Sequence, residues 1–400
     1  MFSGKTVLVT GGTGFIGGRL VEKLVLEHRA RVRVLVRNFA RAARIARLPI
    51  EMLPGDLADP AAVRAAARGC ELVFHCAYDF AGTKDQQRRV AIESTRNVGE
   101  AALEFGLARM VHVSSFAIYA PMQNGDLTED SPWPNCKDSY VLAKREAERL
   151  FRQLHRTQRL PVVIVQPTLV YGPFSPHWTL APIQKLTTGL VPLLNHGDGY
   201  CNAVYIDDVV DAMILAAIRP GIDGETFLIS GEKPITWKDF YRGFENRLGI
   251  HGTVEVVEEE LINRMKARRR QRGTLPQLLN LVRHPEVATG LISLPPVRAT
   301  LKVFKNCLPD DRWQTLKSFL LASPSENHVL NGSGKVLHIP DEMLLGLYRT
   351  KTRVRIEKAR KYLGYVPKFD FERGMDLTAH FIHWANLVSD APGFRYSLES

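Results

Sequence analysis

The sequence predicts an α/β protein built on a doubly wound parallel sheet, with a smaller, mainly helical C-terminal domain. Short apolar runs rich in β-branched residues alternate with longer helical patterns through the first half of the chain. Such alternation indicates parallel strands, because neighbouring parallel strands are usually joined by a helix. A glycine-rich turn follows the first run, and from about Pro173 the pattern loosens into proline-rich and glycine-rich segments.

The apolar runs define the expected strands. We expect them at Thr6–Thr10, Arg31–Val36, around Met52–Leu53, and at Leu72–His75, Met110–Ser114 and Val162–Gln166, with a first helix over Gly18–Leu26. The later runs Ala203–Ile206 and Thr226–Ile229 are expected to be strands that return to the first domain.

These elements suggest where the domains divide. Residues 1–175 form the sheet domain, with 202–231 returning to it, and residues 176–400 form a substrate domain. The substrate domain contains a basic, mainly helical insertion at about 255–340 and an amphipathic stretch at 378–387.

Composition places the chain among ordinary globular proteins, since 45% of its residues are apolar and 24% are charged. Its net charge of +11 suggests an anionic ligand or surface. Five cysteines without CxxC spacing indicate neither a disulfide framework nor a metal site, and a reducing cytoplasm fits them best. We see no room for a secretory signal before Thr6, and the apolar stretch 209–218 is too short to span a membrane.

A glycine-rich loop between the first strand and the first helix predicts a nucleotide site. Glycines permit a tight turn and let the backbone approach a pyrophosphate, which then lies at the helix N-terminus. The loop residues assigned to this site are Thr10, Gly11, Gly12, Thr13, Gly14, Phe15, Ile16 and Gly17.

Arg37 predicts which form of the dinucleotide is preferred. It ends the second strand, twenty residues past Gly17, where NAD-binding chains usually carry an acidic residue. An arginine there can pair with the 2′-phosphate of NADP, and Arg41 and Arg44 follow closely. We therefore expect NADP(H), with NAD(H) as the alternative. Asp56 follows the third strand, where it can accept from the adenine amino group or cap a helix.

Three further residues form a candidate catalytic set. Ser115 follows a strand, at the edge of the sheet where open α/β sheets bind ligands. Tyr140 and Lys144 lie at i and i+4 on one face of a predicted helix. A free tyrosine has a pKa near about 10, so a neighbouring ammonium must stabilise its phenolate before it can act near neutrality.

These motifs together resemble the extended short-chain dehydrogenase/reductase family, also called the epimerase/dehydratase superfamily. The resemblance covers residues 1 to about 250 and resumes at 354–367. Its further matches are His75-Cys76-Ala77, Thr95–Val98, Ser115–Tyr119, Pro167–Pro173 and Tyr205–Val209.

The resemblance implies roles for the candidate residues. Ser115 would hydrogen-bond the substrate oxygen, Tyr140 would exchange its proton, and Lys144 would lower the tyrosine pKa and bind the nicotinamide ribose. Besides the glycine-rich loop, the expected cofactor contacts are Arg37, Asp56, Leu57, Ala77, Tyr140, Lys144 and Pro167.

Departures from the family pattern narrow the reaction. Phe116 and Ala117 replace the Asp-Glu pair of the dehydratases, which disfavours dehydration. Cys201 stands where nucleotide-sugar enzymes usually place an arginine for the diphosphate. Ala91 and Ser94 stand where the family often has Asn and Gly, so the fourth polar group of the site is unidentified.

Three functions are therefore compared. The leading hypothesis is an NADP(H)-dependent oxidoreductase that transfers hydride between nicotinamide and a carbonyl or secondary alcohol. A nucleotide-sugar epimerase, with no net redox change, is the alternative within enzymes. A nonenzymatic NADP-binding regulator is the alternative from another class, and the intact set of Ser115, Tyr140 and Lys144 argues against it.

The basic stretch around Arg264–Arg272 raises the question of partners. No aromatic residue lies between 264 and 283, so a platform for nucleic-acid bases is not expected. Peripheral contact with anionic lipid through 264–321 stays open, as does a homodimer. We expect a small-molecule substrate and a cytoplasmic location, with membrane association left open.

Overall fold

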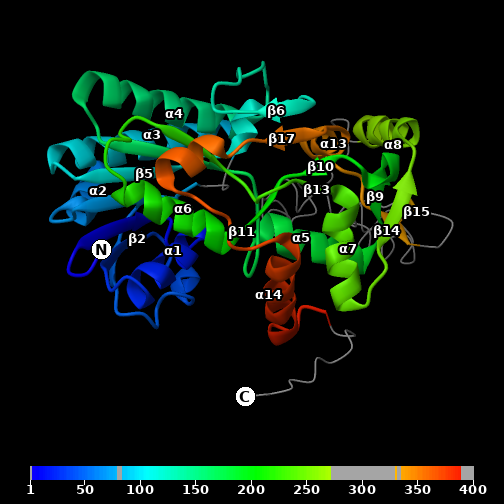
Figure 1. Ribbon diagram of the computed structural model, residues 1–400, viewed down its shortest axis with the longest axis horizontal. Helices are drawn as coiled ribbons and strands as arrows, with labels where there is room; N and C mark the ends of the chain where they lie inside the picture. The colour runs from blue at the N-terminus through cyan, green and yellow to red at the C-terminus, as the bar shows by residue number, and fades with distance from the viewer. Residues whose placement is uncertain (1, 79–82, 272–328, 331–334, 389–400) are drawn as a thin grey trace, which may run out of the picture.

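The computed structural model describes residues 2–78, 83–271, 329–330 and 335–388 (Figure 1). Within them, the central sheet has seven parallel strands in the order β12-β7-β5-β4-β1-β2-β3, which confirms the predicted doubly wound fold. Its strands are β1 (Thr6–Thr10), β2 (Arg31–Val36), β3 (Glu51–Pro54), β4 (Leu72–His75), β5 (Arg109–Val113), β7 (Val162–Pro167) and β12 (Thr226–Ile229).

Helices cover both faces of this sheet, so alternate strand residues enter different cores. Val7 and Val9 of β1 belong to the core cluster that includes α1 (Phe15–Leu26) and α6 (Ile206–Ile218). Leu8 points to the other face, where it joins residues of α2 (Pro60–Ala67), α3 (Lys84–Glu104) and α4 (Ser139–Gln158). Strands β1, β4, β5, β7 and β12 are buried on both faces, so most of their side chains are apolar, whereas the edge strand β3 has no buried residue.

The turn from β1 to α1 is built from residues that lack side chains. Gly11 has φ +69°, and a Cβ there would lie 2.7 Å from the Cα of Ala77, just beyond β4. A Cβ on Gly17 would clash with the carbonyl oxygen of Gly11. The chain therefore needs glycine at both positions to bring α1 and the ends of β1 and β4 together.

Two strands after β7 lie against earlier parts of the chain. Thr226–Ile229 forms β12 and joins the central sheet beside β7. β11 (Ala203–Tyr205) pairs with β8 (Leu169–Tyr171) in a separate two-stranded sheet. Helix α6 also reaches the first half of the chain, because Asp207 accepts from Arg19 at 2.5 and 2.9 Å and Asp211 pairs with Lys23 on α1.

The remaining elements lie beyond the carboxyl edge of the sheet (Figure 1). They are β6 (Gly125–Leu127), α5 (Ala181–Thr188), β9 (Val191–Leu194), β10 (Tyr200–Cys201), β13 (Ile235–Thr236), α7 (Trp237–Leu248), β14 (Thr253–Val256), α8 (Glu258–Gln271), β15 (Val329–Leu330), β16 (Val336–Leu337), α13 (Glu342–Arg349), β17 (Thr352–Val354) and α14 (Phe371–Trp384). β17 pairs in parallel with β6, so a late segment of the chain packs onto an early one. The amphipathic stretch at 378–387 overlaps α14, which starts and ends earlier.

Part of the predicted insertion at 255–340 can be placed. Its beginning forms α8, which is helical as expected. Residues 272–328 and 331–334 lie outside the described residues, as does most of the stretch 264–321 considered for lipid contact.

The close packing of Gly17 predicts a strong effect of one added methyl group. Gly17→Ala should destabilise the fold by about 1–3 kcal/mol, the usual cost of overpacking, and lower the melting temperature. Gly18→Ala is the matched control, since its Cβ would meet neighbours at 3.4 Å and alanine favours a helix. Equal melting temperatures for the two variants in thermal denaturation would contradict this account of the turn.

Candidate active site

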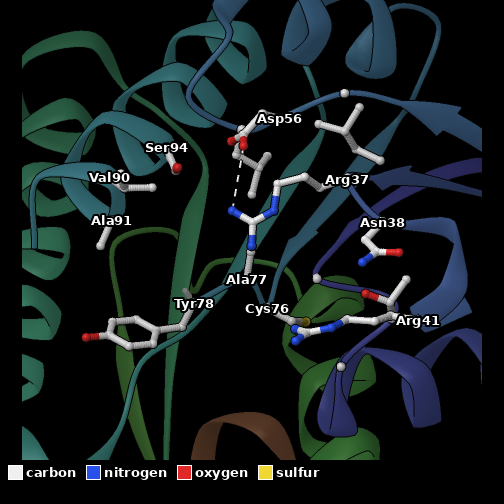
Figure 2. Close-up of a pocket in the computed structure, with 16 residues that line it drawn as sticks. Arg37, Asn38, Arg41, Asp56, Cys76, Ala77, Tyr78, Val90, Ala91 and Ser94 are labelled. Carbon is white, nitrogen blue, oxygen red and sulfur yellow. Dashed lines mark ion pairs between the residues drawn. The ribbon is translucent and has the colours of Figure 1, made fainter. Parts of the chain in front are cut away.

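A cavity of about 550 Å³ lies at the carboxyl ends of β1, β2 and β4 (Figure 2). The strand order reverses between β1 and β4, the place where open α/β sheets bind ligands. Its size falls within the roughly 300–1,000 Å³ of small-molecule sites. Its lining residues are Gly11, Thr13, Gly14, Leu35, Arg37, Asn38, Arg41, Gly55, Asp56, Leu57, Cys76, Ala77, Tyr78, Val90, Ala91 and Ser94.

Only some of the residues expected to contact the cofactor line this cavity. Those that do are Gly11, Thr13, Gly14, Arg37, Asp56, Leu57 and Ala77. Thr10 is buried and shares a hydrogen bond of 2.8 Å with Nδ1 of His75, while Gly12 packs on Val34 of β2. Pro167 is the buried last residue of β7. Phe15, Ile16, Gly17, Tyr140 and Lys144 are also absent from the lining.

Two of the three arginines at the end of β2 face the cavity. Figure 2 shows Arg37 pointing toward Asp56, and the two form an ion pair with a nitrogen to oxygen distance of 3.6 Å. Arg41 also lines the cavity. Arg44 turns away: it donates to Glu22 at 2.8 and 2.9 Å, and its guanidinium lies 4.4 Å from the ring centroid of Phe174. Arg44 therefore holds α1 in place rather than adding charge to the cavity.

The N-terminus of α1 faces the same cavity through Gly14. Gly14 is the N-cap residue and has no side chain to accept from the first backbone N–H groups, and the first turn of α1 contains no acidic residue. Free N–H groups and the positive end of a helix dipole suit an anion. The residues present therefore fit the pyrophosphate of a dinucleotide.

Tyr140 and Lys144 lie in the first two turns of α4. Asp138 begins this helix, its Oδ1 accepting from the backbone N–H groups of Tyr140 at 2.9 Å and Val141 at 3.1 Å. The cap fixes where the helix starts and therefore where both side chains point. Ser115 has a similar local role, since it caps the short helix η2 (Phe116–Tyr119) and accepts from Ala117 at 3.1 Å.

Lys144 ties α4 to the end of β5. Its Nζ is buried and donates to the carbonyl oxygen of Val113 at 2.8 Å. Burial lowers the pKa of Lys144 to about 8, and the negative charges that Cys76 and Glu148 can carry oppose this shift. The charged form of Lys144 is therefore less stable in the folded protein than it would be in water.

Tyr140 lies beside both other members of the set. Burial raises the pKa of the Tyr140 phenol, and a hydrogen bond with Ser115 is the influence that opposes this rise. Lys144 Nζ lies 6.0 Å from the Tyr140 ring centroid and donates to the carbonyl oxygen of Val113, so its expected lowering of the Tyr140 pKa stays a prediction. The structure thus brings Ser115, Tyr140 and Lys144 together, and their roles in proton transfer stay predictions.

Tyr78 connects these residues to the cavity. Its ring meets that of Tyr140 edge to face, with centroids 4.9 Å apart, and lies 5.3 Å from Lys144 Nζ. Figure 2 shows it on the side of the cavity with Val90 and Ala91, away from Arg37. Sequence analysis missed Tyr78, although its place three residues beyond β4 could have suggested it.

Arg145 is a second residue that sequence analysis missed. Its guanidinium donates to the carbonyl oxygens of Ile118 at 2.8 Å, Pro134 at 2.7 Å and Ala120 at 2.9 Å. It therefore holds the segment after Ser115 against α4. No local pattern distinguishes it, because a surface arginine after Lys144 would look the same.

Comparison with known proteins identifies the family. The model of the NAD dependent epimerase/dehydratase family matches residues 7–230, which is more than half of the chain. The chain belongs to this family. The matched region contains the sheet, the cavity and the candidate catalytic set.

Individual relatives differ in what they do. A 2-alkyl-3-oxoalkanoate reductase from Shewanella oneidensis is 26% identical over 57% of this chain and 62% of that protein, so the match leaves more than a third of the reductase uncovered. Sterol demethylase protein B from Methylococcus capsulatus is 32% identical over 57% of this chain and 70% of that protein. The structure of a UDP-glucose 4-epimerase from Thermotoga maritima, at 19% identity and TM-score 0.65, covers 95% of this chain and 99% of that one, and shares its fold.

The described residues contain neither a membrane-spanning helix nor a cluster of potential metal ligands. Within residues 2–78, 83–271, 329–330 and 335–388, no helix is both long and apolar enough to cross a bilayer. The same residues contain no group of three or more His, Cys, Asp or Glu side chains that could hold a metal ion.

The lowered pKa of Lys144 predicts how stability depends on pH. An unperturbed lysine has a pKa of about 10.4, so between about pH 8 and 10.4 the unfolded chain holds a proton that the folded chain has released. Stability contributed by this position should therefore rise with pH across that window. We expect the wild type to gain about 2 kcal/mol over Lys144→Met between about pH 7 and 9.5 in urea denaturation. Exposed Lys361→Met is the control, and a similar trend there would refute the assignment.

Proposed function

We propose that this protein is an NADP(H)-dependent oxidoreductase that transfers hydride between nicotinamide and a carbonyl or secondary alcohol. The observation that supports this most strongly is the meeting of Ser115, Tyr140 and Lys144 at the end of β5, next to the cavity at the carboxyl ends of the strands. The matching relatives that are reductases support it further.

The cavity lining would contact three parts of the cofactor. Gly11, Gly14 and the N-terminus of α1 would hold the pyrophosphate. Arg37 and Arg41 would bind the 2′-phosphate, and Asp56 would accept from the adenine amino group. When bound, the nicotinamide supplies or takes the hydride, and the protein must orient the partners and manage one proton.

Tyr140 is the group that would carry that proton. Burial keeps its phenol protonated at neutral pH, so in the reductive direction it can donate the proton to the substrate oxygen. Ser115 already hydrogen-bonds Tyr140 and would share the same substrate oxygen. Lys144, nearby and charged below about pH 8, would stabilise the phenolate left behind.

The nucleotide-sugar epimerase is the alternative that shares these residues. An epimerase returns the hydride to the same substrate and consumes no cofactor, whereas an oxidoreductase changes NADPH concentration. Purified protein that lowers NADPH absorbance with carbonyl compounds would support the proposal. Conversion of a UDP-sugar to its epimer without net NADPH oxidation would favour the alternative.

The proton-transfer role predicts the effect of removing one hydroxyl. Tyr140→Phe should retain less than about a tenth of wild-type turnover, since general acid/base catalysis typically contributes roughly 10²- to 10⁴-fold. The ring and its packing remain, so the dissociation constant of NADPH should change little. Exposed Tyr362→Phe serves as the control in the same steady-state assay. If Tyr140→Phe kept more than about a tenth of wild-type turnover, the proton would have to come from another group.

Arg37 predicts the cofactor preference. One charge-assisted contact contributes about 1.5–3 kcal/mol, so NADP should bind roughly 10- to 150-fold more tightly than NAD. Arg37→Asp should abolish or reverse this preference in calorimetric titrations, because a carboxylate repels the 2′-phosphate. Arg64→Asp, which changes the charge equally on α2, should preserve it. Equal affinities of the wild type for NADP and NAD would overturn the prediction.

A further inference from the structure

One side of the surroundings of Tyr140 is apolar. Ala117, Ala120 and Val141 form a small buried cluster, and Tyr140 packs against it together with three half-buried side chains. These three, Met122, Cys136 and Met343, each carry sulfur and are called the sulfur wall.

The wall is assembled from distant parts of the chain. Cys136 precedes α4, and Met122 follows η2. Met343 lies in the first turn of α13, more than two hundred residues later. The two segments are joined where Thr352 Oγ1 donates to the Gln123 carbonyl at 2.5 Å and Lys351 N–H donates to Asn124 Oδ1 at 2.8 Å.

The wall has the properties of a surface that receives a ligand. Its members are only half buried, although each packs against the cluster that holds Tyr140. Methionine is flexible and polarisable, so it adapts to apolar shapes. Burial also raises the Tyr140 pKa, which is consistent with weakly hydrated surroundings.

Nucleotide-sugar enzymes of the family usually carry an arginine that binds the diphosphate, and this chain has a cysteine at that position. That position, Cys201, is fully buried in β10 and pairs with Ile235 of β13. Nearby, the hydroxyls of Tyr241 and Tyr348 hydrogen-bond each other at 2.6 Å. A thiol enclosed in this way offers no cation to a diphosphate.

We propose that the substrate is a carbonyl compound with an extended apolar body, which packs on Met122, Cys136 and Met343 while its oxygen meets Ser115 and Tyr140. This inference rests on the proposed function and adds the substrate class. It also explains why a thiol can replace the arginine, since such a substrate has no diphosphate to bind.

Binding measurements can test the substrate class without relying on turnover. The complex of full-length protein with NADP⁺ is titrated with 2-hexanone and 2-decanone in a calorimeter. Each buried methylene should strengthen binding by about fourfold, so 2-decanone should bind at least about tenfold more tightly even if only part of the chain contacts the wall. UDP-glucose should not compete. Equal affinities for the two ketones, or displacement of 2-decanone by UDP-glucose, would overturn the inference.

Variants then locate the apolar contact. Met343→Gln and Met122→Gln keep the side-chain length but add a polar amide, so each should reduce the ratio of the two ketone affinities by at least about threefold. Met343→Leu should restore most of it. Met52→Gln, on β3 and outside the wall, controls for general loss of stability. A similar loss in Met52→Gln would refute the assignment to the wall.

NADPH oxidation with the same ketones separates the two proposals. Chain-length-dependent binding with no turnover of any ketone would contradict the oxidoreductase while leaving the apolar site supported. Turnover of both ketones with equal kcat/KM would support the oxidoreductase and contradict the apolar substrate class.

Discussion

The docking of α4 against the end of β5 is the contact on which the candidate site depends. Lys144 and Arg145 are consecutive cations, both buried, and burying a cation is costly unless its donors find acceptors. Four backbone carbonyls provide them, at Val113, Ile118, Ala120 and Pro134. Because carbonyls near a strand end have fixed positions, these bonds set the distance between Ser115 and Tyr140.

A buried polar network continues along the same helix. Glu148, one turn beyond Lys144, accepts from Gln166 at 2.8 Å and from Arg152 at 3.2 Å. Its carboxylate raises the pKa of Lys144, against the larger lowering that burial causes. Burial lowers the pKa of Lys144 to about 8 and raises the pKa of Tyr140. Burial therefore shifts the pKa of both groups toward their neutral forms.

Two chemically different surfaces meet at Tyr78 and Tyr140. The cavity side has glycines, the free N–H groups of α1 and the ion pair of Arg37 with Asp56, all suited to a charged dinucleotide. The sulfur wall lies beside Tyr140 and suits an apolar molecule. Under the proposed function, a hydride donor and a carbonyl compound of different polarity would be held side by side, each by groups that match it.

Local rules determined much of this protein from its sequence. Strand and helix periodicity predicted the parallel sheet, the glycine turn predicted the place of the cavity, and the spacing of Tyr140 and Lys144 predicted their shared helix face. Arg37 and Asp56 line the cavity because each closely follows a strand, and their contacts with a cofactor stay predictions. Other features depend on contacts between segments that are far apart in the sequence, and tertiary packing decided these. It turned Arg44 toward Glu22, paired the strand at Ala203–Tyr205 with β8, and raised the Tyr140 pKa through burial. It also brought Met343 into the cluster that holds Tyr140, because β17 pairs with β6, and such long-range pairing is decided by the packing of whole elements rather than by neighbouring residues.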